Sequence, residues 1–242
     1  MRSEAQAGPA ALELKGVARR FGLRWALRGV SVRVAPGEVV SVLGPNGSGK
    51  TTLLRVASTA LRPTHGEGTV YGHDLVREAG AVRELIGYFG FAPAVYDDLT
   101  AAENLRFAVR MTGRKPERRE LDDALDRVGL AAEANERARN FSSGMRRRLA
   151  LARLILIRPK LLLLDEPYAS FDEGGIRLLN DYLAEVKRAG CGVLLATHDL
   201  ERVSPIADRS MTIEAGRVVA WDPPDSADAG TRAIPLAAGA TR

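Results

Sequence analysis

The stretch Gly44-Pro45-Asn46-Gly47-Ser48-Gly49-Lys50-Thr51-Thr52 decides the fold of this chain. It fits the pattern G-x-x-x-x-G-K-[ST], which is typical of a loop that wraps phosphate groups. The apolar run 39–43 precedes it and a helix-compatible run, 51–60, follows it, which is the strand–loop–helix setting that such a loop requires. Glycines allow a tight turn, so that successive backbone N–H groups and a helix N-terminus point at negative charge. We therefore predict a nucleotide-binding loop here.

Within this loop, Lys50 would reach the β- and γ-phosphates of a nucleotide, and the Thr51 hydroxyl would ligate Mg²⁺. The alternative is a glycine-rich turn that happens to precede a lysine. Such a match should arise by chance in roughly one chain per hundred of this length. The loop therefore needs support from the rest of the chain before it assigns a function.

Length and composition indicate one large α/β domain. The chain has 242 residues, of which 45% are hydrophobic, enough to bury a sizeable core. The single cysteine, Cys191, excludes an internal disulfide and lies in the apolar run 191–196, so we predict a buried structural thiol. No apolar run approaches the ~20 residues that a membrane helix needs, and no signal pattern opens the chain. We expect a cytosolic or peripheral protein.

The formal net charge of +5 allows two interpretations. One is an anionic partner, such as a nucleotide, a nucleic acid or lipid headgroups. The other is a coding bias toward arginine, because nearly all the basic residues are Arg and they are scattered along the chain. The scatter favours the second interpretation, and we expect no nucleic-acid partner.

The order of the predicted elements indicates a parallel sheet with helices on its faces. Residues 1–10 and 222–242 are rich in Ala, Gly, Pro, Ser and Asp and indicate mobile ends. Strands are predicted at 12–16, 30–34, 39–43, 69–71, 86–91, 161–164 and 192–196, with a closing hairpin at 210–214 and 217–220. Helices are predicted at 51–60, 100–111, 117–128, 142–157, 173–188 and 199–207. The strand-free block 95–157 indicates an inserted helical subdomain.

A second chemical signal is Leu161-Leu162-Leu163-Leu164-Asp165-Glu166-Pro167, a buried-strand pattern that ends in two carboxylates. Ligands bind at the carboxyl ends of strands in open α/β sheets. Asp165 would hold Mg²⁺ through water, opposite Thr51, and Glu166 would polarise the attacking water. The alternative is a strand followed by the acidic N-cap of a helix.

Two further segments carry polar residues next to predicted elements. In Phe141-Ser142-Ser143-Gly144-Met145-Arg146, Ser142 can cap the following helix and Gly144 lets a phosphate approach its amide dipole, although a simple capped helix fits as well. Thr197-His198-Asp199 follows an apolar strand, where His198 could contact a γ-phosphate or serve a structural role.

This ordered set of segments resembles the nucleotide-binding subunit of ABC transporters. The resemblance rests on the phosphate loop, Phe-Ser-Ser-Gly-Met before a helix, the four leucines with Asp-Glu-Pro, Asp172 in the next loop, and Thr-His-Asp, and it covers about residues 11–220. It implies a P-loop NTPase (RecA-like) fold over 11–221, in the α/β class. That fold has a mixed-sheet core, an antiparallel β subdomain and an inserted helical subdomain at about 95–157.

The resemblance also implies residue roles. In the family, two domains pack head to tail, and each ATP lies between one phosphate loop and the partner's signature segment. Ser142-Ser143-Gly144 matches that signature, Asp172 matches a loop that communicates across the dimer, and His198 matches the switch histidine. Phe21 matches the aromatic residue that stacks on adenine, with a core phenylalanine as the alternative.

The function implied is an ATPase that uses ATP and Mg²⁺ and drives a separate membrane permease. It would work as a homodimer, peripherally at the cytoplasmic face of the cell membrane. The helical insertion, with residues 89–99 before it, is the expected docking surface for a permease helix. Segments 96–105, 141–153 and 165–168, with Asp172-Glu173, resemble the ATP-binding subunit of the haem exporter of cytochrome c maturation. The alternatives are another ABC exporter (drug, lipid or polysaccharide), a soluble ABC ATPase of DNA repair or translation, and a non-hydrolysing regulatory cassette.

The chain departs from the family pattern in its Gln loop, in its signature, and at Phe171, where the family usually has Leu. The family's Gln loop should fall at 90–93, but the only glutamine in the chain is Gln6. Its absence bears on how tightly ATP hydrolysis is coupled to transport, whereas catalysis should survive because Glu166 is retained. The signature has Ser143 for the usual Gly and Met145 for the usual Gln. Ser143 keeps a hydroxyl and an N–H, so phosphate contact stays feasible.

Overall fold

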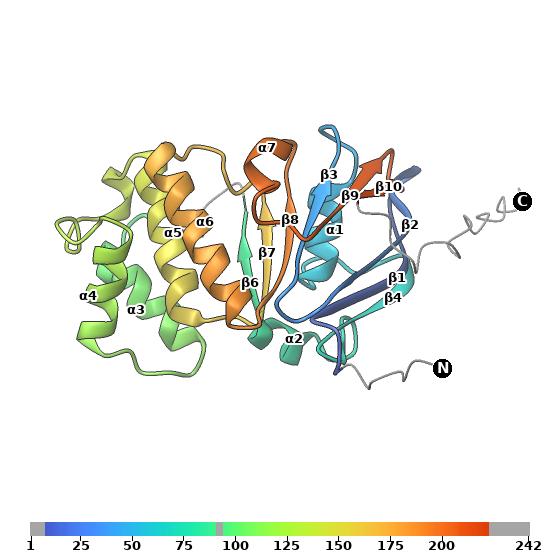
Figure 1. The fold of residues 1–242 in the computed structure, drawn as a ribbon. Coiled ribbons are helices and arrows are strands. Elements are labelled where there is room, and N and C mark those ends of the chain that lie inside the picture. Colours follow the sequence, from blue (N-terminus) through green and yellow to red (C-terminus); the bar gives the residue numbers. More distant parts are fainter. Residues whose placement is uncertain (1–7, 91–93, 223–242) are drawn as a thin grey trace, which may run out of the picture.

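A computed structural model describes residues 8–90 and 94–222 of the chain (Figure 1). The strands are β1 (Leu12–Phe21), β2 (Arg24–Val34), β3 (Val39–Leu43), β4 (His65–Val70), β5 (His73–Asp74), β6 (Ile86–Phe89), β7 (Leu161–Asp165), β8 (Gly192–Ala196), β9 (Arg209–Glu214) and β10 (Arg217–Asp222). The helices are α1 (Lys50–Ala57), α2 (Ala79–Leu85), α3 (Ala101–Met111), α4 (Arg118–Arg127), the 3-10 helix η1 (Ala138–Asn140), α5 (Ser143–Ile157), α6 (Glu173–Arg188) and α7 (Leu200–Val203).

The strands form two sheets. The smaller sheet is antiparallel, with the order β2-β1-β4-β5. The larger one has the order β10-β9-β3-β8-β7-β6, in which β10 runs antiparallel to β9 and the other neighbouring pairs are parallel. This arrangement confirms the predicted fold class, a mixed sheet accompanied by an antiparallel one.

Strand β7 is buried on both faces, as its run of leucines predicts. Successive side chains of a strand point to opposite faces of the sheet. Leu161 and Leu163 therefore pack in one hydrophobic cluster with α1 and the antiparallel sheet. Leu162 and Leu164 pack in the other cluster, with helices α3 to α6. The larger sheet thus lies between two separate layers.

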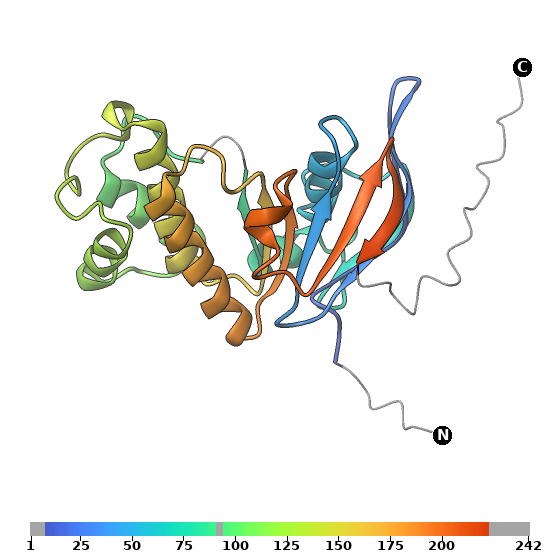
Figure 2. The same ribbon diagram turned by 45° about the horizontal axis from the view of Figure 1, so that its top comes forward.

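The helical layer forms one end of the molecule and the antiparallel sheet the other (Figures 1 and 2). Helices α3, α5 and α6 of this layer begin at polar caps. Thr100 and Glu103 form a reciprocal capping box at α3, Ser142 accepts a hydrogen bond from the Met145 N–H at α5, and Asp172 accepts one from the Gly175 N–H at α6. Such caps satisfy N–H groups that a helix leaves without an internal partner.

The register of the parallel strands places their carboxyl ends at one edge of the larger sheet. Strand β8 pairs in parallel with β3 on one side and with β7 on the other. The segments that follow β3, β7 and β8 therefore start beside one another. These three segments carry the phosphate loop, the pair Asp165-Glu166 and the run Thr197-His198-Asp199.

Several elements differ in extent from the sequence prediction. Strands β1 and β2 are about twice the predicted length, α2 was not predicted, and α7 ends at Val203 instead of continuing to residue 207. Strand β10 includes Asp222, which the sequence assigned to the tail. Near the other end, the carbonyl of Ala10 accepts a hydrogen bond from the Tyr71 N–H.

Cys191 is buried, as predicted, and burial raises the pKa of its thiol to about 12. None of the helices within the described ranges has the length and apolar character needed to cross a bilayer.

Candidate functional site

The loop between β3 and α1 requires glycine at two positions on steric grounds. Gly44 has a φ of 141° and Gly49 a φ of 117°, values that other residues rarely adopt. A Cβ atom on Gly44 would lie 2.1 Å from the carbonyl oxygen of Ile213, and one on Gly49 would lie 2.6 Å from that of Ala26. The loop is therefore pressed between β2 and β9, and this close packing fixes its shape.

Hydrogen bonds tie this loop to itself and to the β9–β10 turn. The Ser48 N–H donates to the Pro45 carbonyl at 3.2 Å, and the Gly216 N–H donates to the Ser48 carbonyl at 2.8 Å. The Lys50 ammonium donates to the carbonyls of Gly44 and Pro45 at 2.6 and 3.3 Å. Helix α1 begins at Lys50, so its first N–H groups face the loop.

Asp165, at the end of β7, meets α1 from across the sheet edge. The Thr51 hydroxyl donates to Asp165 Oδ1 at 3.1 Å, and the Tyr88 hydroxyl donates to Oδ2 at 3.3 Å. Burial raises the pKa of the Asp165 carboxyl above its ordinary value. Burial, with the Asp165 charge nearby, also raises the pKa of Tyr88 to about 12. The carboxylate is thus held between two hydroxyl groups in a largely dry position.

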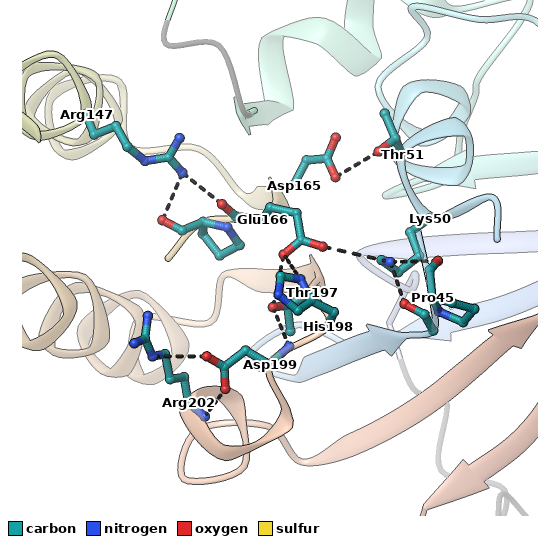
Figure 3. A network of polar contacts seen from close by, with 12 residues as sticks. Pro45, Lys50, Thr51, Arg147, Asp165, Glu166, Thr197, His198, Asp199 and Arg202 are labelled. Atoms are coloured by element: carbon teal, nitrogen blue, oxygen red, sulfur yellow. Dashed lines mark hydrogen bonds and ion pairs between the residues drawn. The ribbon is translucent and has the colours of Figure 1, made fainter. Parts of the chain in front are cut away.

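Glu166 turns away from the strand and toward the phosphate loop (Figure 3). Its φ of 48° lies in the left-handed region, and its N–H donates to the Ala196 carbonyl at 2.8 Å. Its Oε1 lies 3.8 Å from Lys50 Nζ. Its Oε2 accepts a hydrogen bond from the Thr197 hydroxyl at 3.3 Å and lies 3.0 Å from His198 Nδ1. Residues of two other segments, those that follow β3 and β8, thus converge on one carboxylate.

The position of His198 is set by the turn between β8 and α7. The Asp199 N–H donates to the Thr197 hydroxyl at 3.1 Å, and the Asp199 carboxylate accepts a hydrogen bond from the Arg202 N–H, which caps α7. These bonds fix the backbone on both sides of His198. The imidazole itself is 69% exposed, so it can contact a ligand above the sheet edge.

The segment Ser142-Ser143-Gly144 begins helix α5 and lies beside the loop that follows β7. A Cβ atom on Gly144 would lie 3.5 Å from the Ser170 carbonyl oxygen. One turn along α5, Arg148 pairs with Asp172 at 2.9 Å. The Gly175 N–H, which bonds Asp172, and the Arg148 side chain lower the pKa of this aspartate. The structure therefore brings the signature segment and Asp172 together.

The signature segment and the phosphate loop do not form one site within a chain. Helix α5 packs in the cluster on one face of the larger sheet, and helix α1 packs in the cluster on the other face. Strands β7 and β8 stand between the two helices in both views (Figures 1 and 2). Within one chain, the segment 142–144 therefore does not face a ligand bound at the start of α1.

Phe21 is not a core residue, so that alternative is wrong. Its side chain is 47% exposed at the end of β1, and the Arg19 guanidinium lies 4.7 Å from its ring centroid. The ring is accessible to a flat ligand. The predicted position of the missing Gln loop, 90–93, falls mostly outside the described residues, which resume at Ala94.

Sequence reasoning missed three residues of this cluster: Tyr88, Arg147 and the hydroxyl of Thr197. Arg147 could have been found from helical spacing, because it stands four and seven positions before Leu151 and Leu154, which are fully buried. A charged residue on such an apolar face needs partners. No comparable signal in the sequence points to Tyr88.

The residues present fit a nucleoside triphosphate with Mg²⁺. In the described part of the chain, the buried Ser48 hydroxyl has no hydrogen-bond partner, so it is free to donate to a ligand. Among residues 8–90 and 94–222, no cluster of three or more His, Cys, Asp or Glu side chains is arranged to hold a metal ion. Mg²⁺ does not need one, because it is usually held by one or two protein oxygens together with substrate phosphates. Asp165 and Thr51 supply such oxygens.

Comparisons with known proteins agree with this geometry. The sequence profile described as "ABC transporter" matches residues 27–169. The daunorubicin resistance ATP-binding protein DrrA3 of Streptomyces coeruleorubidus is 42% identical over 223 residues, which cover 91% of this chain and 71% of that protein. The cytochrome c biogenesis ATP-binding export protein CcmA 2 of Cupriavidus metallidurans is 41% identical over 191 residues, covering 78% of this chain and 90% of that protein.

Solved structures show the same fold. An ATP-binding subunit of an ABC transporter superposes with a TM-score of 0.82 at 28% identity, over 87% of this chain and 89% of that one. A dimeric ATP-binding cassette in a post-hydrolysis state, bound to ADP and Pi, gives a TM-score of 0.77 at 26% identity, over 87% and 97% of the two chains. The chain therefore belongs to the ABC transporter family, as one of the ATP-binding subunits that hydrolyse ATP to drive transport.

Proposed function

We propose that two copies of this chain pack head to tail, bind and hydrolyse two ATP molecules, and drive export through a separate membrane permease. One observation carries the proposal. Lys50 and Thr51 on one side of the sheet edge, and Asp165, Glu166 and His198 on the other, converge within hydrogen-bonding or ion-pairing distance. Each is of the type that phosphoryl transfer to water uses.

In this mechanism the backbone N–H groups of residues 44 and 46–52 and the Lys50 ammonium bind the phosphates. Thr51 and Asp165 would hold Mg²⁺, which supplies positive charge against the phosphate oxygens. Glu166 accepts a proton from the attacking water, a contribution of about 10²–10⁴-fold for a positioned general base. His198 would donate to the γ-phosphate, and Phe21 would stack on the adenine.

The second chain supplies the rest of the site. ATPase domains of this family work as dimers with membrane permeases. Because the phosphate loop and the signature segment lie on opposite faces of the sheet, a head-to-tail pair can place Ser142-Ser143-Gly144 of one chain over the phosphates bound by the other. The start of α5 would then point its N–H groups at the γ-phosphate. Asp172, beside that segment, would lie at the dimer interface and couple the two ATP sites.

The permease would dock in a groove between the larger sheet and the helical layer. This groove is a cavity of about 910 Å³ lined by β6, α3, α5 and the residues before α3. Its rim exposes three large side chains, Tyr96, Phe107 and Met111, and the first two rings meet edge to face at 4.9 Å. An amphipathic helix at the cytoplasmic end of a permease fits such a groove. The chain would thereby be held peripherally at the cytoplasmic face of the cell membrane.

Two cargo classes compete, each supported by a relative. Haem export for cytochrome c biogenesis is supported by the likeness to CcmA 2. Drug export is supported by the likeness to DrrA3. The direction of transport is the same in both cases, so we propose an exporter first and haem export as the more specific assignment.

Reconstitution of the chain with its cognate permease in vesicles would test both levels. ATPase activity that rises when the permease is added would support the exporter. Further stimulation by haem and not by daunorubicin would support the haem assignment, and the reverse preference would replace it with drug export. No stimulation by the permease would contradict the transport role.

A further inference from the structure

Arg147 is a buried cation in contact with the backbone of the proposed base. Arg147 is only 2% exposed. It lies on α5, close to the signature segment that begins this helix. Its Nη2 donates to the carbonyl oxygens of Glu166 and Pro167, both at 2.9 Å (Figure 3). The guanidinium also lies 4.8 Å from the Phe89 ring centroid and 5.6 Å from that of Phe171.

Such a position is costly for a charged group. Removing a guanidinium from water disfavours the charged form, and burial lowers the pKa of Arg147. Carbonyl oxygens and the faces of aromatic rings compensate part of this cost. A side chain that served only to fill the core would not need a charge. The contacts of the Arg147 guanidinium with the two carbonyls and the two rings therefore indicate a further role.

Glu166 provides that explanation, because its backbone is strained. A non-glycine residue rarely adopts a φ of 48°, and such a conformation persists only where its surroundings enforce it. Two hydrogen bonds grip this residue from opposite sides. Its N–H donates to the Ala196 carbonyl at 2.8 Å, and its carbonyl accepts from Arg147 at 2.9 Å. This backbone conformation turns the carboxylate away from the sheet core and toward Lys50 and His198.

We propose that Arg147 is a positioning residue for Glu166. It holds the peptide that follows Glu166 and so aims the carboxylate at the attacking water. Because Arg147 stands on the helix that begins with the signature segment, any shift of α5 on closure of the dimer is passed to Glu166 through two hydrogen bonds. The inference rests on the proposed role of Glu166 as the general base.

The test compares Arg147→Gln and Arg147→Lys in the full chain, by ATP titration and by single-turnover hydrolysis. Arg147→Gln should lower the hydrolysis rate at least tenfold and leave the ATP dissociation constant within about threefold. Arg147→Lys keeps the charge and should recover part of the rate. Arg127→Gln is the control for loss of a guanidinium away from the site, since Arg127 pairs with Glu185 of another helix and lies over the Tyr182 ring.

A double-variant cycle separates positioning from a merely structural role. If Arg147 acts through Glu166, then adding Arg147→Gln to Glu166→Gln should not lower the residual rate further. Multiplied losses in the double variant, or equal losses in Arg147→Gln and Arg127→Gln, would overturn the inference. If Arg147→Gln fails to fold, Arg147→Lys carries the same cycle. Full activity in Glu166→Gln alone would instead contradict the proposed function.

Discussion

The Nζ atom of Lys50 lies 3.8 Å from Oε1 of Glu166, across the gap between the phosphate loop and the end of β7. Both side chains are mostly buried, and Lys50 donates at the same time to two carbonyls of its own loop. The ammonium that should bind a phosphate thus stands beside the carboxylate that should activate water. A phosphate bound by Lys50 must lie next to Glu166, which is where the attacking water is needed.

Lys50→Ala should weaken ATP binding. The variant removes a charge-assisted hydrogen bond, so the dissociation constant should rise about 10–100-fold. Titration calorimetry with ATP and Mg²⁺ measures it. Lys187→Ala is the control, because Lys187 pairs with Asp208 at the surface, at a distance of 2.6 Å. This variant should bind ATP as the unaltered chain does. Unchanged affinity in Lys50→Ala would contradict the role of the phosphate loop.

Asp165→Asn should separate stability from activity. Burial raises the pKa of Asp165 in the folded chain. The folded state therefore keeps this proton to a higher pH than the unfolded chain does. The protonated Asp165 carboxyl therefore stabilises the folded chain fully below the ordinary pKa of an aspartate, about 3.9. This stabilisation is lost as pH rises through the pKa of Asp165 in the folded chain.

The asparagine variant lacks this loss, so its advantage in melting temperature over the unaltered chain should grow from pH 4 toward neutrality. Each kcal/mol relieved should raise the melting temperature by about 2–4 °C for a chain of this size. The same variant should lose most Mg²⁺-dependent hydrolysis. Thermal melts across that pH range measure the first effect. If the melting-temperature advantage of Asp165→Asn shrinks with rising pH, the pKa of Asp165 is not raised in the folded chain.

Mixed dimers should test the head-to-tail arrangement. Lys50→Ala disables one half of a composite site, and Gly144→Asp, which adds a negative charge facing the phosphates, disables the other. A Cβ at position 144 makes only ordinary contact, so the second variant should fold. Each variant alone should be inactive. Because a mixed dimer keeps one intact site, an equal mixture should recover about a quarter of the activity. No recovery in mixtures shown to exchange subunits would speak against this arrangement.

The docking groove should affect coupling and spare basal hydrolysis. Met111, which lines the groove, is 71% exposed. A glutamate there would bring a charge into the apolar contact with a permease helix. Met111→Glu should therefore lower permease-stimulated turnover several-fold with little effect on the basal rate. Val219→Glu, at an exposed apolar position on β10, is the control. Equal stimulation in the two variants would place the permease elsewhere.

The sequence predicted which residues lie at the sheet edge, but not all of the contacts between them. Thr51 and Asp165 are 114 positions apart, yet motif and strand pattern placed them opposite each other, and they lie 3.1 Å apart. The carboxyl ends of parallel strands must meet at one edge, so the strand assignments suffice for this. The contact of Arg147 with Glu166 depends on the angle at which α5 packs on the sheet. The local sequence does not predict that angle.

Prediction of element lengths failed where the backbone is irregular. The pairing of β1 with β2 shifts register at three points, including between Leu14 and Val17. Each bulge breaks the alternation by which strands are recognised, so only their first or last few residues matched the pattern. Helix α2, with the sequence Ala-Gly-Ala-Val-Arg-Glu-Leu, buries only Val82 and so lacks the apolar period of a longer helix.

Single-turnover hydrolysis by Glu166→Gln tests the central claim most directly. The variant keeps the shape of the side chain but cannot accept the proton. It should bind ATP at least as tightly as the unaltered chain, because the amide no longer pairs with Lys50 or repels the γ-phosphate. Its cleavage rate should fall about 10²–10⁴-fold, and it should accumulate as a closed dimer. Cleavage at the unaltered rate would show that Glu166 is not the base.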